Sequence, residues 1–122
     1  MAARSVKVNL INNSPTDFYH DSDGLEHGDW ITYSEDGAFF MADPVEGNGG
    51  TGYFESESDG VMTGTQGWAT YTSSFGEKFT VKWDNPYSGG NSYSCSIDPA
   101  YKISHKGGGG DNAEVTFTIE LA

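Results

Sequence analysis

Alternation of apolar and polar residues is the dominant local pattern of this 122-residue chain. Near its start, Val6, Val8 and Leu10 fall on one side of an extended segment, and Lys7 and Asn9 fall on the other. Residues two apart share a face of a strand, so this period predicts a strand with one buried face. No ten-residue stretch places apolar residues at the spacing of three and four that a helix requires. The pattern predicts a protein built from strands.

The same pattern recurs along the chain, with Gly, Asn, Asp and Pro in the turns between segments. The predicted strands are residues 6–10, 16–20, 29–34, 53–58, 68–73, 78–84, 92–97, 101–104 and 115–121. Residues 37–45 are ambiguous between a strand and a buried loop, because Phe39, Phe40 and Met41 are consecutive. Eight or nine short strands predict an all-β, single-domain antiparallel β-sandwich spanning residues 1–122, with a small barrel as the alternative.

Two segments between predicted strands are rich in turn-forming residues. Residues 57–67 read ESDGVMTGTQG and residues 84–93 read DNPYSGGNSY. Gly and Asn tolerate left-handed backbone, and Pro pre-sets the first dihedral of a turn. Binding residues are disproportionately found on shaped loops held by a rigid scaffold. We therefore expect at least one of these segments to bind a partner.

The charge balance narrows the choice of partner. Six basic against eighteen acidic residues give a net charge of -12. Nucleic acid and anionic lipid both reward clusters of Lys and Arg, so neither is an expected partner. A zwitterionic or neutral surface, a sugar or a basic protein stays open, and so does a charge that only keeps the protein dispersed.

The sequence shows no feature of a secreted or membrane-spanning chain. Cys95 is the only cysteine, which excludes an internal disulfide. Residues 1–13 lack the apolar centre of a signal peptide, and no apolar run approaches the length of a membrane helix. We expect synthesis in the cytoplasm or in an inclusion, with release by another route, unless a signal was removed from this sequence.

No catalytic, metal or cofactor site is predicted. The three histidines lack metal-ligand spacing, and residues 21–24 and 55–60 do not match the ligand positions of a calcium loop. Carboxylates are abundant, so a glycosidase-like pair could arise by chance. Cys95 lies within an alternating segment, where a structural thiol is the ordinary interpretation. We expect a protein that is not an enzyme.

Aromatic side chains with a polar tip suit core edges, sugar faces and membrane interfaces alike. Trp83 shares a face with Phe79 and Val81, which favours packing for at least this ring. Tyr87 and Tyr93 lie in or beside the 84–93 segment, where packing alone explains them less well. This contrast favours a binding role for that segment.

A series of short motifs runs in order through nearly the whole chain. They are Asn12-Asn13, Gly28 with Trp30 and Thr32, Glu57-Ser58, Gly60 with Met62-Thr63-Gly64-Thr65 and Gly67, Asp84-Asn85-Pro86, Gly89, Asn91, Tyr93, Tyr101, Ile103, Gly107-Gly108, Gly110, Val115-Thr116 and Thr118-Ile119. In this arrangement the chain resembles the aegerolysin family. The resemblance implies a small acidic β-sandwich that binds membrane lipids, especially sphingolipids such as ceramide phosphoethanolamine or sphingomyelin with sterol. It also implies a larger partner that forms pores, which is perforin-like in fungal members and lectin-like in Bacillus.

One motif separates this chain from the fungal members. They carry a Cys-Pro-Trp-like loop where this sequence has Asp84, Asn85, Pro86 and Tyr87. Tyr87 then stands in place of the interfacial Trp, which leaves the fungal lipid specificity open. The Asp-Asn-Pro-aromatic pattern is similar to that of the insecticidal branch, the small components of Bacillus binary crystal toxins.

The working hypothesis is a toxin component that docks on a target membrane and recruits a larger pore-forming protein. The residues expected at the membrane are Trp30, Trp83, Asp84, Asn85, Tyr87 and Tyr93, with Gly89 and Gly90 allowing close approach. The 57–67 segment is expected to be mainly a structural turn, with Met62 as its apolar anchor and with signature residues Asp59, Gly60, Thr63, Gly64 and Thr65. The alternatives are a carbohydrate-binding, lectin-like sandwich without a pore-forming role and a storage or developmental protein. Homo-oligomerisation is left open.

Overall fold

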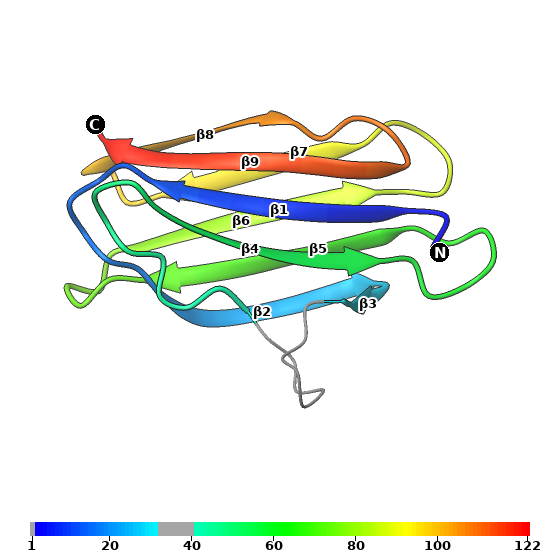
Figure 1. Cartoon of the computed structure of the whole chain (residues 1–122), viewed down its shortest axis with the longest axis horizontal. Coiled ribbons are helices and arrows are strands. Elements are labelled where there is room, and N and C mark those ends of the chain that lie inside the picture. Colours follow the sequence, from blue (N-terminus) through cyan, green and yellow to red (C-terminus); the bar gives the residue numbers. More distant parts are fainter. Residues whose placement is uncertain (1, 32–40) are drawn as a thin grey trace.

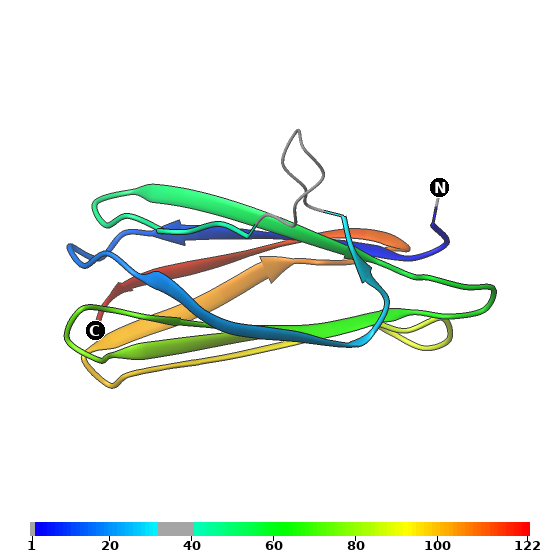
Figure 2. The ribbon, with the colours of Figure 1, turned by 90° about the horizontal axis from the view of Figure 1, so that it is seen from below.

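The computed structural model describes residues 2–31 and 41–122. These residues form two sheets stacked face to face, with no helix in the described ranges (Figure 1, Figure 2). The strands are β1 (Ser5–Asn12), β2 (Tyr19–His27), β3 (Asp29–Trp30), β4 (Gly50–Glu57), β5 (Thr65–Thr72), β6 (Lys78–Asn85), β7 (Ser92–Ile97), β8 (Tyr101–Gly107) and β9 (Asn112–Leu121). The predicted all-β sandwich of eight or nine strands is confirmed.

The two sheets differ in strand number and in how they pair. One has five strands in the order β3-β4-β1-β9-β8, and the other has four in the order β2-β5-β6-β7. Neighbours are antiparallel except β1 and β9, which run parallel from the pair Ser5–Asn112 to the pair Asn12–Ile119. The parallel pair arises because the first and last strands both start at the same end of the sandwich (Figure 1). Local alternation cannot predict this pairing, because it contains no information about strand direction.

The core lies between the sheets and follows the predicted alternation. β1 alternates strictly, with Val6, Val8 and Leu10 fully buried. On the facing sheet, Ala69 and Tyr71 of β5 are buried in the same way. Each buried aliphatic side chain of this size contributes about 1.5–3 kcal/mol relative to exposure. The buried stripes of the two sheets therefore hold the sandwich together.

The largest deviation from the predicted strands concerns residues 16–27. A strand was expected at 16–20, but β2 begins at Tyr19 and continues to His27, with register shifts opposite β5. Residues 21–24, which had been compared with a calcium loop, therefore belong to a strand. Pairing with β5 overrides the turn preference of Asp and Gly here. The expected strand at 29–34 is present as β3 (Asp29–Trp30), while its residues 32–34, together with Phe39 and Phe40, lie outside the described residues.

Tyr71 links the core to the segment before β4. Its hydroxyl donates a hydrogen bond of 2.6 Å to the Ala42 carbonyl, and its ring stacks on Phe79 at 5.1 Å. Burial raises the pKa of Tyr71 well above its ordinary value, and the nearby carboxylates of Asp43 and Asp23 raise it further. The folded protein thus holds the Tyr71 proton at a pH where the unfolded chain releases it.

This difference predicts a loss of stability at alkaline pH. Above about pH 10, the ordinary tyrosine pKa, the unfolded state binds fewer protons than the folded state, so the free energy of unfolding falls as pH rises. Urea unfolding on both sides of that pH is expected to show a smaller decrease for Tyr71→Phe than for the parent. The pKa values of Tyr93 and Tyr101 are also raised by burial, so part of the slope remains. An equal slope in Tyr71→Phe would contradict this origin, and Tyr53→Phe, at an exposed ring, is the matched control.

Candidate functional site

The two glycine-rich segments lie at the same end of the sandwich. The β4–β5 connection, residues 58–64, and the β6–β7 connection, residues 86–91, meet the N-terminal residues 2–4 and the β8–β9 turn, residues 108–111 (Figure 1). We call these four segments the loop end. Backbone bonds from Ser58 to the Arg4 carbonyl and from Ser5 to the Asp111 carbonyl, each 2.9 Å long, join the N-terminal segment to two of the others. Contacts of a few polar side chains add to these bonds.

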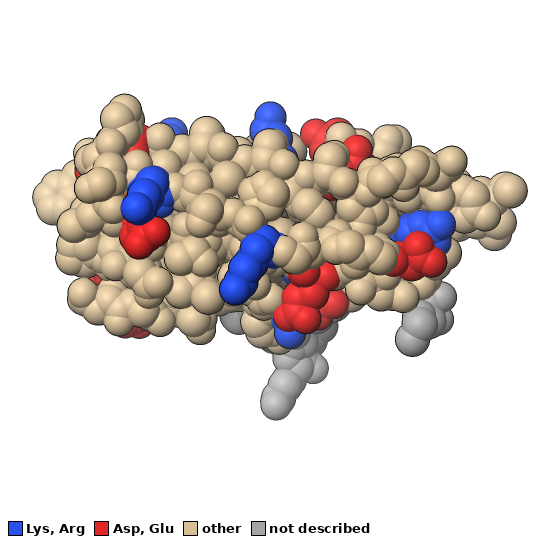
Figure 3. Space-filling view, turned by 90° about the horizontal axis from the view of Figure 1, so that it is seen from above, with Lys and Arg blue, Asp and Glu red and all other residues tan. Residues whose placement is uncertain are grey.

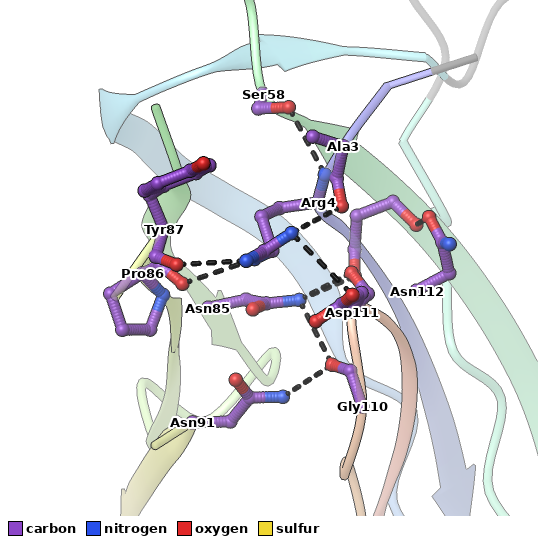
Figure 4. Close-up of polar contacts among 11 residues, drawn as sticks. Ala3, Arg4, Ser58, Asn85, Pro86, Tyr87, Asn91, Gly110, Asp111 and Asn112 are labelled. Atoms are coloured by element: carbon purple, nitrogen blue, oxygen red, sulfur yellow. Dashed lines mark hydrogen bonds and ion pairs between the residues drawn. The ribbon is translucent and has the colours of Figure 1, made fainter. Parts of the chain in front are cut away.

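Arg4 ties the N-terminal segment to the β6–β7 connection. Its Nε donates to the Pro86 carbonyl at 3.3 Å and one terminal nitrogen donates to the Tyr87 carbonyl at 2.8 Å (Figure 4). The guanidinium carbon lies 4.9 Å from the centroid of the Tyr87 ring, which is cation–π geometry. The other terminal nitrogen lies 3.6 Å from the carboxylate of Asp111, so the largely buried Arg4 forms an ion pair with an exposed side chain. Arg4, the only arginine in the chain, thus positions Tyr87.

Asn85 joins three segments from inside the loop end. It is 1% exposed, and its amide nitrogen lies within hydrogen-bonding distance of the carbonyls of Ser5 at 3.0 Å, Asp111 at 2.8 Å and Gly110 at 3.4 Å (Figure 4). A buried carbonyl without a donor is costly, so this side chain stabilises the start of β1 and the β8–β9 turn together. The structure places Asn85 inside the protein, where its side chain bonds to backbone carbonyls, which corrects its assignment as a lipid contact.

Tyr93 braces the same turn from β7. Its hydroxyl donates to the Gly108 carbonyl at 2.7 Å, and Asn91 donates to that carbonyl at 2.7 Å and to Gly110 at 2.9 Å. Gly108 has a φ of 93°, and a Cβ there would come within 2.3 Å of the Tyr93 ring. Burial raises the pKa of Tyr93. This half-buried ring packs on the glycine turn, so it shapes the loop end more than it projects from it.

Of the aromatic residues predicted for the membrane, Trp83 belongs to the core and Trp30 packs against it. Trp83 is 1% exposed, and its indole nitrogen donates to Ser56 at 3.0 Å. Its ring centroid lies 5.4 Å from that of Phe54 and 5.8 Å from that of Trp30. Trp30 is half-buried and packs edge-on against both rings. The alternation within residues 78–84 already favoured a core position for Trp83, and the structure shows this position. The assignment of Trp83 to the membrane is therefore corrected.

The exposed apolar surface of the loop end comes mainly from the β4–β5 connection. Val61 is 90% exposed and Met62 is 68% exposed at the tip of the β4–β5 connection, and Tyr87 nearby is 40% exposed. Met62 has a φ of 59°, in the left-handed region that few residues other than Gly occupy. Thr63 closes this turn, since its hydroxyl donates to the Gly60 carbonyl at 2.9 Å and accepts from the Gly60 amide at 3.0 Å. The expectation of an apolar anchor is wrong for Met62, because the turn directs it outward.

Two hollows flank these tips. One, of about 460 Å³, is lined by Ala2, Ala3, Ser58, Gly60, Val61, Met62 and Tyr87. The other, of about 390 Å³, is lined by polar groups and backbone, including Arg4, Asn91, Tyr93, Asp111 and the glycines 89–90 and 107–110. A Cβ added at Gly89 or Gly90 would meet no atom within 4 Å, so this rim is open. The loop end thus combines a small apolar projection with a polar recess.

Three further features of the molecule are the surface charges of one face, possible metal ligands and possible membrane helices. On the face seen in Figure 3, Lys and Arg side chains alternate with Asp and Glu and form no continuous basic patch. Within residues 2–31 and 41–122, no three His, Cys, Asp or Glu side chains are grouped to hold a metal ion. In the same ranges, no helix is long and apolar enough to cross a bilayer.

In a comparison with protein-family models, the model described as Aegerolysin matches residues 3–121. The chain belongs to the aegerolysin family. The match extends over all nine strands that the structure describes, so the resemblance seen in the sequence motifs is confirmed at the level of the family. Among curated protein sequences, none matches this aegerolysin significantly.

Solved structures share the fold of this aegerolysin at low sequence identity. RahU protein, solved with a TRIS molecule, has a TM-score of 0.80 and 20% identity over 100% of this chain and 98% of its own. The lipid binding protein Nakanori has a TM-score of 0.83 and 12% identity over 98% of this chain and 72% of its own. The Xerocomus chrysenteron lectin XCL is more distant, with a TM-score of 0.57 and 12% identity over 95% and 98% of the two chains. At these identities the similarity shows the fold alone.

The sequence predicted the segments that form the loop end of this aegerolysin better than the individual residues of the site. It singled out both glycine-rich segments, and the structure brings them together. It did not single out Arg4 or Val61, although a lone arginine and an apolar residue flanked by Gly60 were visible. Asp84 lies on β6 opposite Gln66 and Ser92, on the outer face of a sheet and one residue before the end of β6, and its expected lipid contact stays a prediction.

Proposed function

We propose that this aegerolysin binds lipid of a target membrane through its loop end and acts with a larger protein that forms the pore. The observation that carries the proposal is the exposed pair Val61 and Met62 on a braced turn beside Tyr87. Transfer of apolar side chains of this kind from water to the bilayer interface is favourable. Membership of the aegerolysin family and the fold shared with a lipid binding protein support the same role.

The polar recess beside the tips favours a zwitterionic headgroup. Arg4 supplies a positive charge and Asp111 a negative one, and Asn91 and Tyr93 add neutral polar groups around the same hollow. A net charge of -12 opposes approach to an anionic surface, so specificity must come from contacts with the individual lipid rather than from bulk attraction. Tyr87, with its ring under the Arg4 cation, has the amphipathic character typical of the headgroup level. A sphingolipid meets these requirements, because its headgroup is zwitterionic and because the amide and hydroxyl groups of its backbone, which phosphatidylcholine lacks, can bond to the polar recess.

The motif at residues 84–87 supports a proposal for the partner and for the branch of the family. The Asp-Asn-Pro-Tyr sequence is similar to that of the small components of Bacillus binary insecticidal toxins. We therefore propose a binary system, in which this protein binds the membrane without catalysis and recruits the pore-forming component. The loop end lies against the bilayer in this arrangement, which leaves the sheet faces and the opposite end available to that partner.

Vesicle sedimentation tests the lipid preference directly. The protein is expected to sediment with phosphatidylcholine vesicles that contain sphingomyelin and cholesterol or ceramide phosphoethanolamine. It is expected to stay in solution with phosphatidylcholine alone or with added phosphatidylserine. Dye release from the bound vesicles should require the protein encoded in the neighbouring reading frame. Binding to none of these vesicles, or equal binding to all, would overturn the lipid assignment.

A further inference from the structure

The outer face of the four-stranded sheet carries a groove that is separate from the apolar tips of the loop end and shares Tyr93 with the polar recess. It has a volume of about 550 Å³ and crosses β5, β6 and β7 on the side away from the core. Its lining residues are mostly polar and include one partly exposed indole: Glu26, Gln66, Gly67, Trp68, Thr80, Lys82, Trp83, Asp84, Ser92, Tyr93 and Ser94. The groove differs in composition from the apolar tips of the loop end.

The strand register arranges these side chains in rows. Adjacent strands pair so that one side chain from each of β5, β6 and β7 lies in each row: Gln66–Asp84–Ser92, Trp68–Lys82–Ser94 and Thr70–Thr80–Ser96. Directly opposed side chains are about 5 Å apart, and successive rows on one face are about 7 Å apart. The face is thus a grid of hydroxyl, amide and charged groups around a single aromatic ring.

Trp68 forms one wall of the groove, and β2 holds it there. The indole packs against Gly24, where a Cβ would come within 2.8 Å of the ring nitrogen. Glycine at this position lets the ring lie close to the sheet, since any side chain would displace it. The ring is only half-buried and lines the cavity, so part of it faces the groove. This is a fixed aromatic surface bordered by polar groups.

The polar groups around the indole are free to bind a ligand. The hydroxyls of Thr70 and Thr80 bond to each other at 2.8 Å. Among the described residues, by contrast, the side chains of Gln66, Lys82 and Asp84 have no hydrogen-bond or ion-pair partner. Together they offer an amide, an ammonium and a carboxylate within one cavity. They provide neutral and charged hydrogen-bonding groups, both donors and acceptors, to a ligand with many hydroxyl groups.

We propose that this groove is a binding site for a neutral saccharide. A sugar ring presents an apolar face of C–H groups, which packs on an aromatic ring, and an edge of hydroxyls, which bonds to amide and carboxylate groups. Lys82 is outnumbered by Glu26 and Asp84, so the groove disfavours a phosphate-rich or sulfated ligand. Asp84 and Ser92 lie beside the β6–β7 connection. A saccharide in the groove would therefore lie on the flank of the molecule that borders the loop end.

Titration of the isotope-labelled protein with free oligosaccharides tests the site without any membrane. The probes are short oligomers of glucose, mannose, galactose and N-acetylglucosamine, followed by amide and indole resonances. At least one probe is expected to shift the Trp68 indole and the backbone of residues 82, 84 and 94. Trp68→Ala should weaken that binding at least about tenfold. Trp68→Phe, which keeps an aromatic face, should restore part of it, and Ser94→Arg should block the groove from an exposed position without a change in the core.

The outcomes separate this site from membrane docking. A Val61→Asp and Met62→Asp double variant should bind the free sugar unchanged, while Ser94→Arg should keep its binding to sphingolipid vesicles that carry no sugar. Vesicles carrying a glycolipid with the same sugar then distinguish a lipid-linked from a free source, since only a lipid-linked source adds to vesicle affinity. No response to any probe, or a response that Trp68→Ala and Ser94→Arg leave unchanged, would overturn the proposal.

Discussion

Replacement of both Val61 and Met62 by aspartate is expected to abolish vesicle binding while the protein stays folded. Transfer of each parent side chain from water to an apolar environment contributes about 1.5–3 kcal/mol. Their combined loss corresponds to a decrease of more than about a hundredfold in vesicle affinity, before the added cost of two carboxylates at the interface. Both side chains are strongly exposed in the free protein, so the substitution removes little packing. Sedimentation with sphingomyelin–cholesterol vesicles measures the effect.

The opposite end of the sandwich offers a matched control for this experiment. Phe75 is 83% exposed in the β5–β6 turn, far from the loop end. Phe75→Asp introduces one such carboxylate, against two in the double variant, at a similarly exposed apolar residue, and its vesicle binding is expected to equal that of the parent. Equal loss in both variants would point to a general effect of charge, and full binding by the Val61 and Met62 double variant would exclude the tips as the docking surface.

Truncation of Trp83 to alanine is expected to cause the largest loss of stability of any variant considered. Buried Trp→Ala substitutions cost about 3–5 kcal/mol, because the surroundings only partly fill the cavity. Trp83 is 1% exposed and contacts the rings of Trp30 and Phe54, and its indole nitrogen bonds to Ser56. A loss of this size is a large part of the 5–15 kcal/mol typical of a domain. Urea unfolding is expected to show a midpoint shifted far downward or a chain that does not fold.

A conservative substitution keeps this prediction informative if the alanine variant does not fold. Trp83→Phe retains an apolar ring and loses only the indole hydrogen bond, while Ser56 keeps its 2.7 Å bond to Thr65. We expect a moderate loss of stability and unchanged vesicle binding, because this ring does not reach the surface. Normal stability combined with lost vesicle binding in Trp83→Phe would contradict the core assignment and restore Trp83 as a lipid contact.

Much of the strand pattern could be predicted because it is a local property. Alternation in β1, β5, β6 and β9 specifies which residues face the core, and the bounds of β7 were predicted without error. β2 was misjudged because Asp and Gly within it favour a turn locally, whereas pairing with β5 extends them. The family could also be recognised, because its motifs are short and ordered along the chain.

The candidate site was less predictable, because exposure depends on contacts between distant segments. Asn85 and Tyr93 occur in a loop-like stretch, but they bond to the β8–β9 turn and so serve packing. Val61 and Met62 resemble core residues in composition, yet the turn closed by Thr63 directs them into solvent. Residue type alone does not decide whether a side chain in such a segment is buried or exposed.

By itself the sequence determined the fold class, the family, and the two glycine-rich segments from which a binding end is built. These follow from periods, turn chemistry and motif order, which operate over a few residues. Only the tertiary structure decided that β1 and β9 run parallel, that Arg4 and Asn85 assemble four segments at one end, and which apolar side chains remain exposed there. The physical reason is that these features arise from contacts between residues as many as 107 positions apart, which no local pattern records.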